Sequence, residues 1–242
     1  MRTLVIGDIH GGHKALLQVL DRAGVTQDDT LIFLGDYVDG WSESAETIEE
    51  LLALSASNNC TFIRGNHDLW CGLWLEKGET NPIWLAHGGE ETIRSYIHSR
   101  HLTKDTHKKF FKNLHDYYLD SKNRLFLHAG FTSMYGVGKE EYESNYYWDR
   151  TLWEAALLAD KVDKEILRDN PPERFKHYSE IYIGHTPTTN YNQNVPMQAY
   201  NLWNIDTGAA FKGKLTILDV DTKEFWQSDS LPSLYPKEKG RN

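Results

Sequence analysis

The first 70 residues alternate short apolar runs with amphipathic stretches. Apolar runs at 4–6, 31–34 and 61–63 predict three buried strands. Between these runs, residues 13–23 and 44–56 carry apolar side chains at helical spacing, which predicts two helices. This β-α-β-α-β order is typical of a mainly parallel sheet with helices covering its faces.

Two longer segments interrupt the pattern further along the chain. Residues 69–120 are rich in aromatic side chains and predict helices, whereas residues 131–178 are irregular and contain the helix-breaking pair Pro171-Pro172. We interpret both as insertions, at approximate boundaries, into one domain that spans residues 1–242.

The second half of the chain predicts further strands. Apolar runs return at 125–127 and 181–183, and again at 202–205 and 214–220. Glycines between the last two runs suggest that these strands form an antiparallel ribbon. The tail after Ser230 is rich in proline and lysine, so we expect it to fray.

Composition narrows the class of protein. A formal net charge of −9 argues against a general nucleic-acid binder, because such proteins carry basic patches that neutralise phosphates. The two cysteines, Cys60 and Cys71, cannot form a disulfide framework, which favours a reducing compartment. No apolar run approaches the roughly 20 residues of a membrane span, and the N-terminus lacks the features of a signal peptide. We therefore expect a cytoplasmic protein without nucleic-acid or membrane partners.

Five short polar motifs each follow directly on an apolar strand. They are Gly7-Asp-Ile-His-Gly11, Gly35-Asp-Tyr-Val-Asp-Gly40, Gly65-Asn-His-Asp68, His128-Ala-Gly130 and Gly184-His-Thr186. One such motif alone would more often be a turn or a structural histidine. Strand ends of a parallel sheet converge at its carboxyl edge, so the five together predict one site. Mixed oxygen and nitrogen ligands without thiolates favour manganese, iron(II) or zinc over calcium or a structural zinc site.

This set of motifs resembles the calcineurin-like metallophosphoesterases, and within them the phosphoprotein phosphatase family, over nearly the whole chain. In Gly184-His185-Thr186-Pro187, proline stands where many other metallophosphoesterases have a second histidine. The short length and the His87-Gly-Gly89…Thr92…Ser95-Tyr96 segment resemble the small bacterial and phage branch, which also includes diadenosine tetraphosphatases. The resemblance implies an α/β four-layer sandwich, with two mixed sheets flanked by helices.

The resemblance also implies two divalent cations, with Mn²⁺ expected first and Fe²⁺ or Zn²⁺ as alternatives. Asp8, His10 and Asp36 would hold the first cation. Asp36 would bridge to the second cation, which Asn66, His128 and His185 would complete. Two cations about 3.5–4 Å apart bind a hydroxide between them and polarise the phosphoryl oxygens. A metal lowers the pKa of its bound water, so no covalent intermediate is needed.

Other residues are expected to act on the substrate. The resemblance implies that His67 protonates the leaving alkoxide while Asp39 orients its ring and keeps it charged near pH 7. The alternative role for His67 is a supporting hydrogen bond to Asp8. Arg64 and Arg150, together with Asn66, are the candidates for binding phosphate, because a guanidinium pairs bidentately with phosphate oxygens. Arg150 is the stronger candidate, since Tyr147-Trp-Asp-Arg150 resembles a Trp-x-Arg element of the family.

One position departs from the family pattern. The family usually reads Gly-Asp-x-Val-Asp-Arg-Gly, and its arginine contacts the substrate phosphate, whereas this chain has Gly40-Trp41. Loss of a charge-assisted contact costs about 1.5–3 kcal/mol of binding free energy. Either another cation, such as Lys139 or Arg94, replaces it, or the substrate differs from a phosphoprotein.

Aromatic and histidine side chains leave two questions open. Five aromatic residues near the motifs are candidates for stacking on a nucleobase or lining a peptide groove: Trp41, Trp84, Tyr146, Tyr147 and Trp148. We expect Trp70 and Trp74 to fill the core of the first insertion. We expect four histidines to lie on a solvated helix face: His98, His101, His107 and His115.

These observations support three functions in decreasing order. The first is a serine/threonine phosphoprotein phosphatase, the second a hydrolase of dinucleoside polyphosphates, and the third a non-catalytic metal-binding adaptor. The partner is accordingly a phosphorylated protein or a small phosphoester. Aromatic stacking pairs around the cleft would favour a nucleotide, and a long open groove would favour a protein.

Overall fold

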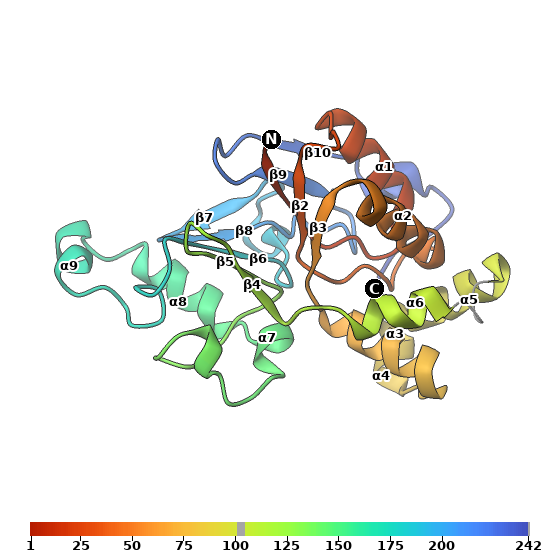
Figure 1. The fold of residues 1–242 in the computed structure, drawn as a ribbon, viewed down its shortest axis with the longest axis horizontal. Helices are drawn as coiled ribbons and strands as arrows, with labels where there is room; N and C mark the ends of the chain where they lie inside the picture. The colour runs from red at the N-terminus through yellow and green to blue at the C-terminus, as the bar shows by residue number, and fades with distance from the viewer. Residues whose placement is uncertain (101–104, 242) are drawn as a thin grey trace.

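A computed structural model describes residues 1–100 and 105–241, and its strands form two sheets with the orders β10-β9-β1-β2-β3 and β4-β5-β6-β8-β7 (Figure 1). The first sheet consists of β1 (Thr3–Ile6), β2 (Thr30–Phe33), β3 (Asn59–Phe62), β9 (Thr216–Asp219) and β10 (Phe225–Gln227). The second consists of β4 (Tyr117–Leu119), β5 (Arg124–Leu127), β6 (Glu180–Ile183), β7 (Met197–Ala199) and β8 (Leu202–Asn204).

Both sheets are mixed. β1, β2 and β3 pair in parallel, as the sequence pattern predicts, and β9 joins β1 on its other side in antiparallel orientation. In the second sheet β5, β6 and β8 are parallel, while β4 and β7 pair antiparallel at the edges. The predicted arrangement of two mixed sheets flanked by helices is confirmed.

Helices cover the outer faces of both sheets and fill the two long segments between strands (Figure 1). The first sheet is covered by α1 (His13–Arg22) and α2 (Ser44–Ser57). The first long segment forms α3 (Asn66–Lys77), α4 (Pro82–Trp84), the π-helical turn η1 (Leu85–Gly89), α5 (Glu90–Ser99) and α6 (Asp105–Lys112). The second forms the 3₁₀ turn η2 (Val137–Lys139), α7 (Asn145–Trp148), α8 (Thr151–Ala159) and α9 (Lys164–Asp169). The 3₁₀ turn η3 (Thr188–Tyr191) and α10 (Leu231–Leu234) complete the elements. Within the described ranges, no helix combines the length and the apolarity needed to cross a bilayer.

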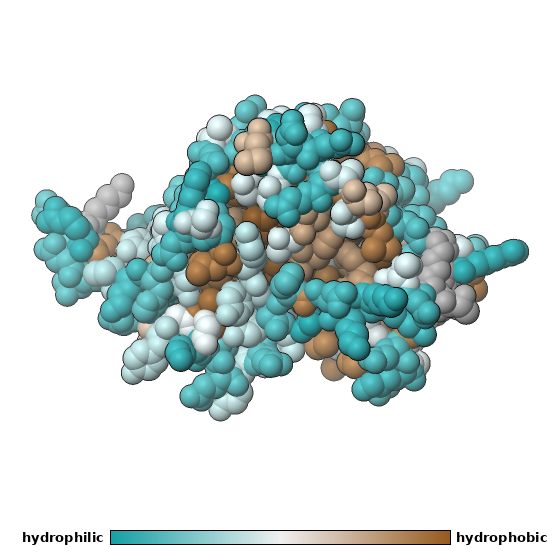
Figure 2. Space-filling model, in the orientation of Figure 1, coloured by the Kyte–Doolittle hydropathy of each residue, from teal (hydrophilic) through white to brown (hydrophobic). Residues whose placement is uncertain are grey.

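Side-chain alternation along the strands separates three buried clusters. Leu4 and Ile6 of β1 face the helices, whereas Val5 faces the second sheet. Phe126 of β5 and Tyr182 of β6 approach Val5 from the other side, and their rings stack with centroids 4.9 Å apart. On the face drawn in Figure 2, hydrophobic atoms show mainly toward the middle of the view, and hydrophilic side chains cover its periphery. The apolar core therefore lies between the sheets and beneath the helices on either side.

Two predictions about the C-terminal part are wrong. β8 and β9 do not form a ribbon, because β8 belongs to the second sheet and β9 to the first. The chain between them crosses from one sheet to the other, and that crossing brings Asp206 to the strand ends. The tail does not fray either: it forms α10, and the buried Tyr235 stacks on Trp41 with ring centroids 5.2 Å apart.

The prediction for the histidines holds only in part. His98 is exposed on α5, as expected, and His101 lies outside the described residues. His115 is exposed but lies outside the helices, where it forms a β-bridge with Ile63. His107 is fully buried instead: its Nε2 lies 2.7 Å from Oε1 of Glu49 and its Nδ1 lies 2.9 Å from the Tyr96 hydroxyl. A polar partner on α2 satisfies this ring, which the local sequence around it does not reveal.

The core between the sheets gives a first testable prediction. Replacing the buried Phe126 with alanine removes a ring that both sheets contact, so it should lower the free energy of unfolding by about 3–5 kcal/mol. The matched control is Phe225→Ala on edge strand β10, where the ring is 41% exposed and the change should stay within about 0.5 kcal/mol. Urea denaturation measures both. Equal losses would contradict the central packing of Phe126.

Candidate active site

The carboxyl ends of strands from both sheets meet at one cavity of about 270 Å³. His10 follows β1, Asp36 follows β2, Asn66 follows β3 and His185 follows β6, and all four line the cavity. Asp8 and His128 complete the predicted set of ligands; both are almost fully buried beside these four. The strand-end argument from the sequence thus places the predicted ligands around one point.

Asp8, His10 and Asp36 form the first group that can hold a metal ion, with potential ligand atoms all within 4.8 Å of one another. Nε2 of His10 lies 3.5 Å from Oδ2 of Asp36 and 3.9 Å from Oδ2 of Asp8. Nδ1 of His10 lies 2.9 Å from the carbonyl oxygen of Asp39, to which it can donate. This hydrogen bond leaves Nε2 as the lone-pair atom that faces the two carboxylates.

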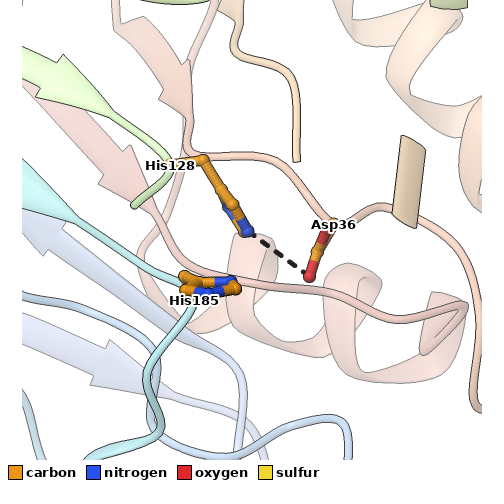
Figure 3. Close-up of side chains that lie close together, drawn as sticks. All are labelled: Asp36, His128 and His185. Carbon is orange, nitrogen blue, oxygen red and sulfur yellow. Dashed lines mark ion pairs between the residues drawn. The ribbon is translucent and has the colours of Figure 1, made fainter. Parts of the chain in front are cut away.

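The second group comprises Asp36, His128 and His185 (Figure 3). Figure 3 shows His128 pointing at the carboxylate of Asp36, where Nε2 and Oδ2 lie 3.5 Å apart. Nδ1 of His128 is 2.8 Å from the Leu34 carbonyl, which again directs Nε2 into the site. Asn66 Oδ1 lies 3.2 Å from that Nε2. Asp36 belongs to both groups and can therefore bridge two ions.

The donor set fits divalent cations. Nε2 of His185 is buried without a hydrogen-bond partner among the described residues, and such an atom needs a ligand. Burial raises the pKa of Asp8 well above its usual value, and the nearby charge of Asp206 raises it further. Burial acts to lower the pKa of His128, but Asp36 raises it to about 10. The crowded carboxylates thus attract positive charge, and carboxylate, amide and imidazole donors suit Mn²⁺, Fe²⁺ or Zn²⁺.

The backbone at the site adopts uncommon conformations. His10, Asp36, Asp39 and His185 all have φ between 52° and 72°, in the left-handed region that non-glycine residues rarely occupy. Each costs on the order of 1–2 kcal/mol. Gly184 is required because a Cβ there would stand 2.1 Å from Oδ1 of Asp8. The surrounding packing therefore imposes the turns that aim these side chains at the cavity.

His67 and Asp39 form a buried pair beside the first group. Nδ1 of His67 lies 2.6 Å from Oδ2 of Asp39, which also accepts a hydrogen bond from Nε1 of Trp84 at 2.7 Å. Oδ1 of Asp39 accepts from the Thr92 hydroxyl at 2.6 Å. Within the described chain no hydrogen bond joins His67 to Asp8; its backbone N–H donates to Asp36 instead.

The charge state of this pair differs from the expected imidazolium. Burial lowers the pKa of His67 to about 3 and raises that of Asp39 to about 8, although hydrogen bonds from Thr92 and Trp84 lower the latter. At neutral pH these values give a neutral imidazole and a carboxylic acid. That pair holds the same two protons as an imidazolium with a carboxylate. In either form Nε2 carries a hydrogen, because Nδ1 faces Asp39.

Of the two arginines predicted to bind phosphate, only Arg150 lies at the cavity. Arg150 lines the cavity, and its charge lowers the pKa of His185, for which burial is the largest cause. Arg64 does not line it: its guanidinium pairs with Asp116 at 2.7 Å and donates to the Leu114 carbonyl. Of the two suggested replacements for the family arginine, Arg94 pairs with Glu90 on the surface, and neither it nor Lys139 is among the lining residues.

Two charged lining residues, Asp206 and Arg241, are not among the residues predicted from the sequence. Asp206 follows the apolar run at 202–205 just as the other site residues follow their strands, so the same rule should have found it. Arg241 reaches the cavity from the tail, where no strand or motif precedes it. Trp84, a candidate for stacking on a nucleobase, is instead fully buried and donates a hydrogen bond to Asp39.

The remaining aromatic residues divide between core and cavity. Trp41 is buried against the tail, while Tyr146 and Tyr147 lie in the cluster under the second sheet. Trp70 and Trp74 pack against the core as expected, but Trp70 also lines the cavity together with Trp148, which is 42% exposed. The ring centroids of Trp70 and Trp148 lie 5.3 Å apart, and Trp148 lies 6.0 Å from the ring of His185. An aromatic wall thus adjoins the second group.

Two relatives match this chain over almost the whole length of both proteins. The chain is 27% identical over 252 residues to an asymmetrical bis(5'-nucleosyl)-tetraphosphatase PrpE of Anoxybacillus flavithermus, covering 96% of this chain and 94% of the relative. The same named protein of Bacillus mycoides is 27% identical over 251 residues, covering 98% and 96%.

Solved structures share the fold at lower identity. A candidate diadenosine tetraphosphatase superposes with a TM-score of 0.63 at 16% identity, covering 93% of this chain and 92% of that one. A protein serine/threonine phosphatase from Saccharomyces cerevisiae gives 0.61 at 15% identity, covering 96% and 83%. At these identities the likeness shows the fold alone. The calcineurin-like phosphoesterase family model matches residues 1–209. The chain therefore belongs to the calcineurin-like phosphoesterase family, and it is a hydrolase of phosphoesters.

Proposed function

We propose that this chain hydrolyses dinucleoside polyphosphates. Water attacks one phosphorus, the P–O–P bond to the next phosphate breaks, and the two products share the protons of the water. The observation that carries this proposal is the aromatic wall of Trp70 and Trp148, which lines the same cavity as the two ligand groups. The asymmetrical tetraphosphatase relatives support the same substrate class.

The dimensions of the cavity support a small substrate. Its volume of about 270 Å³ is near the lower limit of roughly 300 Å³ for small-molecule sites. Such a space holds a phosphoryl group and one flat ring, while the rest of a longer substrate extends outside. Stacking of a base on an aromatic side chain contributes about 1–3 kcal/mol. Ile83 and Phe211 add further apolar surface to this cavity.

We assign the two ligand groups to two divalent cations. Asp8 and His10 would hold the first, Asn66, His128 and His185 would hold the second, and Asp36 would contribute to both. Cations bound there supply an activated water and neutralise charge on the phosphoryl oxygens. The chain itself fixes the orientation of the His10 and His128 imidazoles through their Nδ1 hydrogen bonds. Manganese is our first expectation, because the donors are oxygen and nitrogen without thiolate.

His67 is the proposed proton donor to the leaving oxygen. Nε2 keeps a hydrogen in either form of the pair, and Asp39 fixes the ring through the bond to Nδ1. Arg150 is the proposed phosphate-binding residue on the side of His185, because it lines the cavity there. Arg64 has no part in this proposal, because its guanidinium already pairs with Asp116.

Hydrolysis of phosphoserine or phosphothreonine is a second candidate. The buried pair of His67 and Asp39 favours it, because an alkoxide needs a proton more than a leaving phosphate does. The same pair argues against a non-catalytic adaptor, since a purely structural protein has no need of a proton donor at the metal groups.

Metal dependence gives a testable prediction. Exhaustive chelation should abolish turnover, and added Mn²⁺ should restore it. Asp36→Asn should reduce the metal bound per chain more than any other single change, because Asp36 belongs to both groups. Elemental analysis after dialysis measures this, with the exposed Asp28→Asn as the control. Full turnover by the metal-free protein would end the two-cation proposal.

The proton donor is tested by His67→Asn. Turnover of alkyl phosphates should fall by roughly 10²- to 10⁴-fold with metal content unchanged, and aryl phosphates should lose less because their leaving groups need less protonation. The control is His98→Asn on the exposed face of α5. An equal loss on both substrates would point to a structural role for His67.

Substrate class is tested with Trp148→Ala on metal-matched protein. If stacking on Trp148 contributes about 1–3 kcal/mol, KM for diadenosine tetraphosphate should rise roughly 5- to 150-fold, while KM for p-nitrophenyl phosphate changes little. Tyr135→Ala removes an aromatic residue that is 83% exposed and outside the cavity, so it serves as the control. Rapid turnover of phosphopeptides without turnover of diadenosine tetraphosphate would favour the second candidate.

A further inference from the structure

The tail carries Arg241 into the cavity. Arg241 lines it together with His10, Asp36 and His67, although it lies far from all of them in sequence. The sequence pattern gives no hint of this placement, because the tail reads as a polar, frayed segment.

Several contacts hold the tail in place. Tyr235 stacks on Trp41, and its hydroxyl accepts a hydrogen bond from the backbone N–H of Lys14 at 2.9 Å. Glu238 accepts hydrogen bonds from the backbone N–H and the hydroxyl of Ser42, at 3.0 and 2.8 Å. Trp41 and Ser42 thus fix the path of the chain just before it reaches the cavity.

The last contacts orient Arg241 itself. Its backbone N–H donates to the Ala210 carbonyl at 2.8 Å, and its guanidinium carbon lies 5.4 Å from the centre of the Phe211 ring. The Nε atom is buried and has no hydrogen-bond partner among the described residues. A buried donor of this kind costs about 1–3 kcal/mol unless a ligand satisfies it.

Gly40 provides the room for this arginine. A Cβ at Gly40 would stand 3.3 Å from Cγ of Arg241, and the φ of Gly40 is 129°, which strains any other residue. An arginine at position 40 would therefore be strained and would crowd Arg241. Gly40 leaves space for Arg241, and Trp41 holds the tail that carries it. These two contacts explain why Gly40-Trp41 stands where the family pattern has arginine and glycine.

Arg241 is close enough to the ligand groups to act on their charge. Its charge contributes to lowering the pKa of His10 and His67, for both of which burial is the largest cause. Arg150 acts in the same way on His185. The two guanidinium groups therefore stand beside different ligand groups of the same cavity.

We infer that Arg241 binds substrate phosphate, with its guanidinium taking the place of the arginine that position 40 lacks. Its unpartnered Nε and the rest of the guanidinium fork match the oxygens of a phosphate. Arg150 and Arg241 together suit a chain of phosphates, which rests on the proposed function and deepens it. Neither Lys139 nor Arg94 is needed as a replacement.

The experiment measures the affinity of inorganic phosphate for the Mn²⁺-loaded protein by calorimetry, with metal content matched. Arg241→Ala should weaken phosphate binding roughly 10- to 150-fold. Arg241→Lys keeps the charge without the fork and should lose only part of the affinity. Lys239→Ala removes an exposed cation from the same tail, outside the cavity, and should change nothing. Gly40→Arg should leave the phosphate affinity unchanged or weaken it, because Arg241 already supplies the guanidinium there.

The inference is overturned if Arg241→Ala binds phosphate as tightly as the unmodified protein, if Lys239→Ala loses as much, or if Gly40→Arg tightens binding. Absence of phosphate binding by the metal-loaded unmodified protein overturns it as well. A phosphate affinity that depends on Arg241 without turnover of dinucleoside polyphosphates supports the inference and defeats the proposed function. Turnover of those substrates with an affinity indifferent to Arg241 does the reverse.

Discussion

The site depends on one buried carboxylate, Asp36, which lies between two imidazoles. Nε2 of His10 and Nε2 of His128 each stand 3.5 Å from its Oδ2. Burial acts to raise the pKa of Asp36, but the charge of His128 lowers it well below its usual value. His128 follows a strand of the second sheet and Asp36 a strand of the first, so the carboxylate remains charged in the interior because the two sheets meet there. The convergence of the two sets of strand ends is thus an electrostatic requirement as well as a feature of the topology.

The sequence predicts those features that depend on neighbouring residues. The β-α-β-α-β order of the first 70 residues predicts the parallel pairing of β1, β2 and β3, because each apolar run and the helix after it follow one another within a few residues. The placement of β8 and β9 in different sheets depends on long-range pairing, and the glycines between them fit a ribbon equally well. His107 is misjudged for the same reason: its partner Glu49 lies on another helix. Local patterns cannot report on such contacts.

The residues of the candidate site also divide into those that local sequence predicts and those that depend on long-range contacts. The six proposed ligands and Asp206 all come directly after strands, so the rule that strand ends converge reaches each of them. Arg241 and Trp84 lie outside that rule. Arg241 reaches the cavity because Tyr235 of the tail packs on Trp41. Trp84, which lies in the first long segment, donates a hydrogen bond to Asp39. Their roles depend on the path of a segment, and no spacing within the segment encodes that path.

The groups that can hold cations and the groups that favour one substrate therefore come from different parts of the chain. Strand ends supply the groups that can hold cations, and those groups suit any phosphoester or phosphoanhydride. The walls come from elsewhere: Trp70 from α3, Trp148 from α7 and Arg241 from the tail. The aromatic pair offers a surface on which a base can stack, and the two guanidinium groups offer donors for phosphate oxygens. In the proposed function these walls, rather than the strand ends, favour a substrate with both a base and phosphates.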